Sequence, residues 1–160
     1  MALISSKFLK LAVSLGACYL AAFVGSLFTT PKISTWYATL TLPSFAPPES
    51  IFAPVWTTLY TLMGISAYVI WLKYDKDHRV RRALALFAIQ LAVNPFWSFA
   101  FFGYESPLTG LAVIAVLWAL IVVTMYEFHK ISKTAGILLL PYLLWVSFAM
   151  ILNFAIWRLN

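Results

Sequence analysis

Apolar residues fall into five long runs along this chain, and polar residues gather between them. Each run is almost free of charge and is about as long as a helix of roughly 20 residues, which spans the ~30 Å hydrocarbon core of a bilayer. Lys10 lies one turn inside the first run, where its stem can carry the ammonium to the interface. The pattern predicts an all-α integral membrane bundle, a single domain over residues 1–160, with five transmembrane helices at Phe8–Phe28, Ile51–Leu72, Ala83–Phe102, Pro107–Phe128 and Ala135–Trp157.

The composition agrees with a membrane protein. Of the 160 residues, 63% are hydrophobic and 10% are charged, whereas a soluble domain is near a quarter charged. The start resembles a secretory signal, with Lys7 and Lys10 before an apolar run and Cys18 in a loose lipoprotein-like context. Because this run continues to Phe28, longer than the core of a signal, we expect an uncleaved first helix. Cys18 is the only cysteine, which excludes an intrachain disulfide.

The basic residues predict the orientation of the chain. With five spans, Lys32 and Arg158 lie on one side, and the other basic residues share the side of the N-terminus: Lys7, Lys10, Lys73, Lys76, Arg79, Arg81, Arg82, Lys130 and Lys133. The positive-inside rule then places the N-terminus in the cytoplasm, if the membrane is a bacterial inner membrane. Control of topology explains the net charge of +6 better than a nucleic-acid partner does.

The connections between the runs are uneven. Gly103–Ser106 is a short turn in which Ser106 is placed to cap the fourth helix and Pro107 suits its first turn, so helices three and four should be antiparallel neighbours. The longest connection, about residues 29–50, holds four prolines together with aromatic residues, and we expect it to form an ordered cap over the helix ends. Small residues four apart allow close helix approach, within the bundle or between subunits: Ala17, Ala21 and Gly25, and Ala88 and Ala92.

Ionisable residues limit the chemistry that the spans could perform. The acidic residues all lie in loops or at helix ends: Glu49, Asp75, Asp77, Glu105 and Glu127. Ion-driven pumps usually need such groups at mid-membrane depth, so ion-coupled transport is not expected. His78 and His129 also lie at helix ends, and no residues have the spacing of a metal site or an activated nucleophile. The sequence therefore predicts no metal site and no conventional catalytic site.

Aromatic and neutral polar residues form stripes on three of the expected helices. The stripes converge toward the half of the membrane next to the proline-rich connection, and Pro95 and Pro141 can open space by bending two helices. A pocket of this kind suits a flat, largely apolar ligand. Packing of the bundle explains the tryptophans equally well, and Asn94 and Asn153 suit interhelical hydrogen bonds as much as ligand contact. The stripes are Trp56, Tyr60 and Met63; Gln90, Asn94, Trp97 and Phe101; and Tyr142, Trp145, Ala149 and Leu152.

Other tryptophans have simpler explanations. Trp71 and Trp157 end their spans and are expected to anchor them at the interface. Trp118 lies in the middle of the fourth span, where it is expected to face lipid or a neighbouring subunit.

The order of these residues closely resembles the translocator protein family, also called the tryptophan-rich sensory protein or peripheral benzodiazepine receptor family. The resemblance covers nearly the whole chain and runs in order through all five helices. It is carried by Trp36-Tyr37-x-x-Leu40-x-x-Pro43-Ser44-x-x-Pro47-Pro48, Pro54-x-Trp56-x-x-Leu59-Tyr60, Gln90-Leu91-Ala92-x-Asn94-x-x-Trp97, Phe101-Phe102-Gly103, Pro141-Tyr142-Leu143-x-Trp145 and Leu152-Asn153.

The resemblance implies a five-helix bundle, commonly a homodimer, that needs no cofactor. Its ligands would be porphyrins such as protoporphyrin IX and haem, drug-like benzodiazepine-site compounds and, in animal members, cholesterol. By matching position, Trp36 and Pro47 would belong to the lid over the site. The ligand pocket would be lined by Ala53, Trp56, Asn94, Trp97, Trp145, Ala149 and Leu152.

Three functions follow as hypotheses. The first is sensing, transport or regulation of tetrapyrroles. The second is light-dependent photo-oxidation of protoporphyrin IX, an activity credited to some bacterial members of the family and attributed there to tryptophans matching Trp56 and Trp145. The third is a stress-regulatory role in which the basic segment Lys73–Arg82 contacts a partner. Sterol binding is doubtful, because Phe154 replaces the tyrosine of the animal cholesterol-recognition segment.

Overall fold

A computed structural model describes residues 2–74 and 77–160 and confirms the all-α membrane fold. Lys76, which was assigned to the side of the N-terminus, and Asp75, which was assigned to a loop or helix end, lie outside the described residues. The helices are α1 (Ala2–Ile33), α2 (Phe52–Trp71), α3 (Arg79–Ser98), α4 (Pro107–Ile131), α5 (Lys133–Leu138) and α6 (Leu140–Leu159), with short 3-10 turns η1 (Tyr37–Thr39) and η2 (Glu49–Ile51) and a π-helical turn η3 (Phe99–Gly103). Five helical segments of the described chain are long and apolar enough to cross a bilayer: Ser6–Ile33, Glu49–Trp71, Arg79–Gly103, Pro107–Ile131 and Lys133–Leu159.

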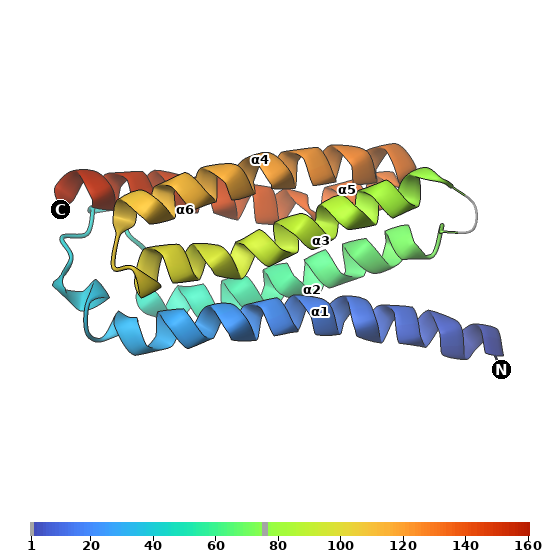
Figure 1. Cartoon of the computed structure of the whole chain (residues 1–160), viewed down its shortest axis with the longest axis horizontal. Helices are drawn as coiled ribbons and strands as arrows, with labels where there is room; N and C mark the ends of the chain where they lie inside the picture. Colours follow the sequence, from blue (N-terminus) through green and yellow to red (C-terminus); the bar gives the residue numbers. More distant parts are fainter. Residues whose placement is uncertain (1, 75–76) are drawn as a thin grey trace.

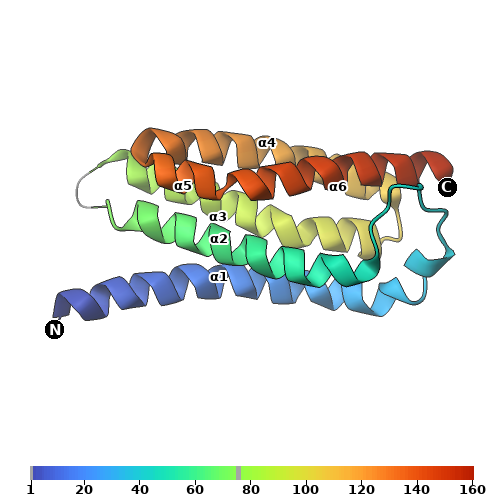
Figure 2. The same ribbon diagram turned by 180° about the vertical axis from the view of Figure 1, so that it is seen from behind.

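The five spans form one elongated bundle (Figure 1). Helix α1 packs against α2 and α3, and α4 packs against α3, α5 and α6. The N-terminus, the α2–α3 connection and the start of α5 lie at one end, which we call the basic end. The loop 34–51, the α3–α4 turn and the C-terminus lie at the other, which we call the loop end (Figure 2).

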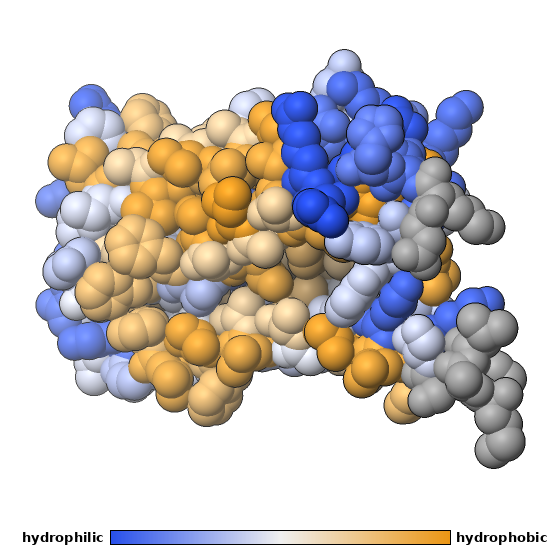
Figure 3. Space-filling model, turned by 45° about the vertical axis from the view of Figure 1, so that its right-hand side comes forward, coloured by the Kyte–Doolittle hydropathy of each residue, from blue (hydrophilic) through white to orange (hydrophobic). Residues whose placement is uncertain are grey.

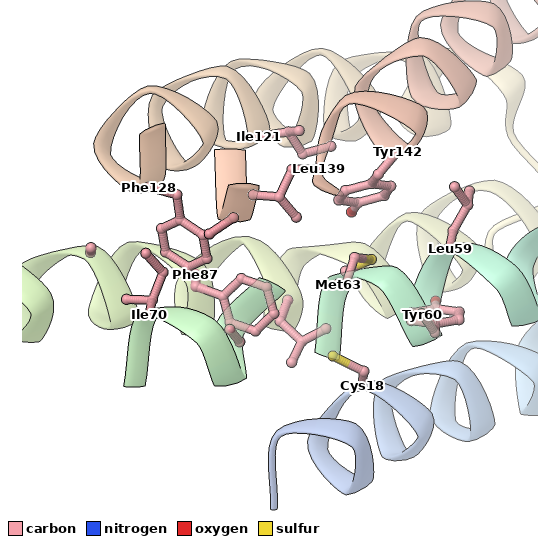
Figure 4. Packing of buried hydrophobic residues seen from close by; sticks show 14 of the residues in the cluster. Cys18, Leu59, Tyr60, Met63, Ile70, Phe87, Ile121, Phe128, Leu139 and Tyr142 are labelled. Atoms are coloured by element: carbon pink, nitrogen blue, oxygen red, sulfur yellow. The ribbon is translucent and has the colours of Figure 1, made fainter. Parts of the chain in front are cut away.

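Apolar side chains cover the middle of the bundle, as a bilayer requires. Figure 3 shows hydrophilic residues gathered toward the two ends of one face and hydrophobic residues between them. Inside, one continuous hydrophobic core follows the bundle axis, with contributions from all five spans (Figure 4). Phe87 and Phe128 stack in this core with ring centroids 5.7 Å apart.

Helix ends at the basic end are held by lysine side chains. Lys73 Nζ donates to the carbonyl oxygen of Ile131 at 3.0 Å, and Lys10 Nζ lies 3.5 Å from the carbonyl oxygen of Trp71. Both carbonyls belong to the last turn of a helix, where unpaired acceptors and the negative end of the dipole favour a cation. In the α2–α3 connection, hydrogen bonds from Arg79 lower the pKa of Asp77 to about 2, so this carboxylate stays ionised even in moderately acidic solution.

The helix ends differ from the apolar runs that predicted them. Helix α1 continues to Ile33 and accommodates Pro31 in its last turn, so the loop begins at residue 34 and not at residue 29. Helix α3 begins at Arg79, before the apolar run starts at Ala83. The reason is that an apolar run marks only the part of a helix that lies in hydrocarbon, whereas the helix itself extends into the interface.

The turn between α3 and α4 has the predicted capping. Ser106 is extended, and its hydroxyl oxygen accepts a hydrogen bond from the Thr109 backbone N–H at 3.3 Å. Pro107 occupies the first turn of α4. Helices α3 and α4 are therefore joined as antiparallel neighbours, as the sequence indicates.

The last span is broken where a proline follows. Helix α5 ends at Leu138 and α6 begins at Leu140, with Pro141 in its first turn. Proline lacks the N–H that would continue the hydrogen-bond ladder of α5, and its ring crowds the preceding turn. Both segments pack against α4, but α5 also packs against α2, whereas α6 makes little contact with α2.

Candidate functional site

Aromatic and amide side chains from α2, α3 and α6 meet inside the bundle toward the loop end. The Tyr60 hydroxyl donates to Asn94 Oδ1, and Asn94 Nδ2 donates to the Tyr142 hydroxyl at 2.8 Å. All three residues are buried, and Figure 4 shows the two tyrosines projecting inward from α2 and α6. Three spans are thus joined by one short polar chain in an apolar interior, which we call the Tyr60–Asn94–Tyr142 triad.

Trp56 lies beside this triad. Its ring is 5.5 Å from that of Tyr60 and 6.3 Å from that of Tyr142. The structure therefore brings Trp56 and Asn94, two of the predicted site residues, into one aromatic group. Ala53, a further predicted residue, lies exposed in the first turn of α2, outside this group.

Trp97 lies closer to the loop end than the triad does, in a layer of aromatic rings beneath the loop. It stacks on Phe101 at 5.4 Å, and its indole N–H donates to Asn153 Oδ1 at 3.2 Å. Asn153 in turn donates to the Pro107 carbonyl at 2.7 Å, so its amide joins α3, α4 and α6. Leu152 is buried in the same layer, among the rings under the loop.

Trp145 lies near the outer side of α6. Its ring is 5.9 Å from Phe52 and 5.6 Å from Phe148, and Ala149, one turn further along α6, is half-buried against the core. The Trp145 indole N–H is inaccessible to water, and no hydrogen-bond partner for it exists among the described residues. An unpaired buried donor costs free energy, so a ligand acceptor that reached this N–H after a rotation of the indole would be favoured.

A groove of about 580 Å³ lies beside Trp145, between α2 and α6. Its volume falls in the range of small-molecule sites. Of the residues predicted to line the ligand pocket, Trp145 alone lines this groove. The lining residues are Pro54, Val55, Thr58, Leu59, Pro141, Leu144, Trp145 and Phe148. The open space therefore lies to one side of the predicted pocket, whose centre is filled by the triad and its aromatic neighbours.

The loop 34–51 covers the loop end and is fixed at several points. Tyr37 is buried against Phe101 and Phe102, and Trp36 meets the same two rings edge-on at 5.3 and 6.1 Å. Burial, and then the charge of Glu49, raise the pKa of the Tyr37 phenol above its ordinary value. Pro47, the other predicted lid residue, is half-buried in this loop.

Three polar contacts also hold the loop end. Asn160 accepts a hydrogen bond from the Thr41 backbone N–H at 2.9 Å and donates to the Thr41 carbonyl at 3.1 Å. Lys32, at the end of α1, pairs with Glu105 in the α3–α4 turn at 2.6 Å. The loop is thus an ordered cap.

Some functional candidates were not apparent from the sequence. Tyr60 and Tyr142 lie on the predicted stripes, but their pairing through Asn94 depends on how the helices are rotated. Gln90 is buried one turn below Asn94, and neither its amide nitrogen nor its amide oxygen has a partner within residues 2–74 and 77–160. Trp118 was expected to face lipid or another subunit; it is half-buried, and its indole donates to Ser147 of α6 at 2.8 Å.

The fold and this site define a class: a five-span helical membrane protein with an aromatic site inside the bundle, beneath an ordered loop. The sequence profile of the TspO/MBR family matches residues 14–158. The chain is 46% identical to the tryptophan-rich protein TspO of Chlorobaculum tepidum over 98% of its own length and 99% of that protein. It is 37% identical to the translocator protein of Bos taurus over 88% of its length and 84% of that protein. The chain therefore belongs to the TspO/MBR family.

Proposed function

We propose that this protein binds a tetrapyrrole such as protoporphyrin IX at the aromatic site and acts as a sensor or carrier of it in the membrane. The observation that carries the proposal is the position of Trp145. Its indole borders both the aromatic interior and the groove, and its N–H is buried without a partner among the described residues. A flat aromatic ring with polar groups at its edge would stack on the indoles and supply the missing acceptor.

Movement of the ligand should follow its own gradient. The acidic residues that the structure describes lie at the ends of the bundle: Glu49, Asp77, Glu105 and Glu127. A carrier coupled to protons or sodium ions usually has such groups near the bilayer midplane. We also propose that the basic end faces the cytoplasm, because its lysines and arginines follow the positive-inside rule.

Replacing Trp145 with phenylalanine should weaken binding about three- to tenfold, because the ring stays but the N–H donor is lost; one neutral hydrogen bond contributes about 0.5–1.5 kcal/mol. The measurement is quenching of tryptophan fluorescence by protoporphyrin IX in the dark, in detergent. Trp157→Phe, at the exposed end of α6, is the matched control and should keep the wild-type affinity. Equal affinities in all three proteins would refute the assignment of Trp145, and absence of saturable quenching in the wild type would refute the proposed function.

Light-dependent oxidation of the bound porphyrin is a second candidate. Trp56 has two phenol rings within 6.3 Å, and Trp145 lies next to Phe52 and Phe148, so an oxidised indole would have aromatic neighbours to share the charge. Dioxygen would be the oxidant: the excited porphyrin takes an electron from the indole and passes it to O2, the indole cation takes an electron back from the porphyrin, and the superoxide formed adds to the oxidised ring. The net change is addition of O2 to the porphyrin, and it requires neither a metal nor an acid–base pair.

Under illumination in air, the porphyrin absorbance should therefore decay several-fold more slowly in Trp56→Phe and Trp145→Phe than in the wild type, and should be constant in the dark. Samples are compared at equal porphyrin occupancy, so that weaker binding is not mistaken for slower oxidation. The control is Trp118→Phe, which removes an indole of α4 that contacts Ser147 of α6. In this variant the porphyrin should bleach at the wild-type rate. Equal bleaching rates in all four proteins would show that Trp56 and Trp145 do not take part in oxidation of the porphyrin, and only the binding function would remain.

A further inference from the structure

We propose that the groove between α2 and α6 is a lateral entrance, through which the tetrapyrrole passes from the bilayer to the aromatic site. This inference rests on the proposed function, because it takes the same ligand to the same site. It adds the route and assigns a role to residues outside the predicted pocket, namely Val55, Thr58, Leu144 and Phe148.

The groove opens toward the hydrocarbon side of the bundle. Both of its walls belong to spans, and Leu144, on its rim, exposes 61% of its surface. Its base reaches Leu59, which is buried in the core beside Tyr60. A molecule dissolved in the bilayer therefore meets the groove directly, and only side chains separate it from the Tyr60–Asn94–Tyr142 triad.

The break in the last span explains why this side is open. Up to Leu138, α5 packs on α2 and closes the wall; beyond Leu140, α6 lies mainly against α4 and only a few of its side chains reach α2, which remains packed against α1 on its other side. Pro54 and Pro141 each lie in the first turn of their helix, where no N–H is needed, and both line the groove. The opening is thus built into the backbone rather than produced by one missing side chain.

A smaller hollow of about 360 Å³ lies at the loop end next to Trp36 and Asn160, but many contacts tie the loop to the bundle there. Rings of the loop pack on Phe101 and Phe102, Asn160 binds Thr41 through two hydrogen bonds, and Lys32 pairs with Glu105. Entry at this end would require several of these contacts to open together. Entry through the groove would instead pass the side chains of Trp145 and Leu59, which line it.

An acyl chain would fill the same apolar groove, but it has no group that could accept the Trp145 N–H. The Thr58 hydroxyl, the other polar group of the lining, already donates to the Pro54 carbonyl at 2.9 Å. The remaining donor is therefore the indole, which a ring carrying carboxylates would satisfy. This favours the tetrapyrrole over lipid as the specific occupant.

Filling the groove tests the route. The variant Thr58→Phe with Leu144→Phe narrows it, and the matched control is Thr57→Phe with Ile151→Phe, two exposed positions on the same helices that do not line it. Each protein is reconstituted in phosphatidylcholine vesicles and mixed with protoporphyrin IX, and the rate of tryptophan quenching is followed by stopped flow. Partition of the porphyrin into protein-free vesicles, measured by its own fluorescence, identifies the faster step that precedes binding.

The groove variant should bind about tenfold more slowly, equivalent to a barrier about 1.4 kcal/mol higher, and release more slowly as well, so that equilibrium quenching changes little. The control should keep the wild-type rate within about twofold. A groove variant that binds at the wild-type rate would overturn the lateral entrance while leaving the proposed function intact. If the wild type shows no saturable quenching, the proposed function itself fails.

A second variant addresses the loop end without altering the groove. Asn160→Ala removes both hydrogen bonds to Thr41, and the rate of binding from the bilayer should remain within about twofold of the wild type. Acceleration of tenfold or more would show that the loop gates access, which would overturn the proposal even if the groove variant fails to fold.

Discussion

Replacing Asn94 with leucine should lower the free energy of unfolding by about 2–3 kcal/mol, because two buried phenols lose their partner at once. This exceeds the ~0.6 kcal/mol average for single hydrogen bonds between membrane helices. Tyr60 donates to the Asn94 oxygen and Tyr142 accepts from its nitrogen, and both tyrosines are buried where water cannot replace the amide. The measurement is reversible unfolding in detergent, followed by circular dichroism.

A compensating variant separates this explanation from a simple packing defect. Asn94→Leu combined with Tyr60→Phe and Tyr142→Phe removes every member of the triad, and most of the stability should return, since apolar replacement of all partners is nearly neutral. If Asn94→Leu unfolds at the wild-type midpoint, the triad does not stabilise the bundle. If the triple variant is less stable than the single one, the loss comes from shape and not from unpaired polar groups.

A methyl group at Gly110 should destabilise the protein by about 1–3 kcal/mol through overpacking. A Cβ at this position would lie 2.9 Å from Phe101 Cβ and 3.0 Å from Asn153 Oδ1, so η3 and α6 would both have to move. Since Asn153 accepts from Trp97, Gly110→Ala should also perturb the layer of rings under the loop. Thermal unfolding in detergent measures the first effect, and near-UV circular dichroism the second.

The same substitution at Gly16 is the control. Nothing lies within 4 Å of a Cβ built at that position, which is exposed on α1. Gly16→Ala should be neutral or stabilising by up to about 1 kcal/mol, because alanine favours a helix over glycine. Equal destabilisation at both positions would mean that glycine is required for some reason other than close packing.

The sequence predicts the number of spans because lipid leaves the backbone little choice. A run of some 20 apolar residues can satisfy its own amides in hydrocarbon only as a helix, so five runs give five spans. The cap at Ser106 is equally local, since it depends on one hydroxyl three residues before one N–H. The end of α1 at Ile33 and the start of α3 at Arg79 could not be predicted from nearby residues, because the membrane interface tolerates both helix and loop.

The site is only partly predictable for a similar reason. Periodicity places Trp56, Asn94 and Trp145 on inward or half-buried faces, and the structure agrees with that. Periodicity alone does not reveal which tyrosines reach Asn94, because this depends on how three helices are rotated relative to one another. The groove is still less accessible to sequence reasoning, because it results from the divergence of α6 from α2 after the break at Leu139.

The π-helical turn at Phe99–Gly103 changes how helix three is aligned with its neighbours. A π-helical turn contains one residue more than a turn of α-helix. The side chains that follow it are therefore rotated about the helix axis relative to those that precede it. Two consecutive rings, Phe101 and Phe102, are accordingly both buried, although neighbours on a regular helix point about 100° apart. Loss of one residue here would therefore act as a rotation of the loop end of helix three, leaving its span nearly unchanged, and a one-residue gap at this position in a relative would indicate a differently turned ring layer.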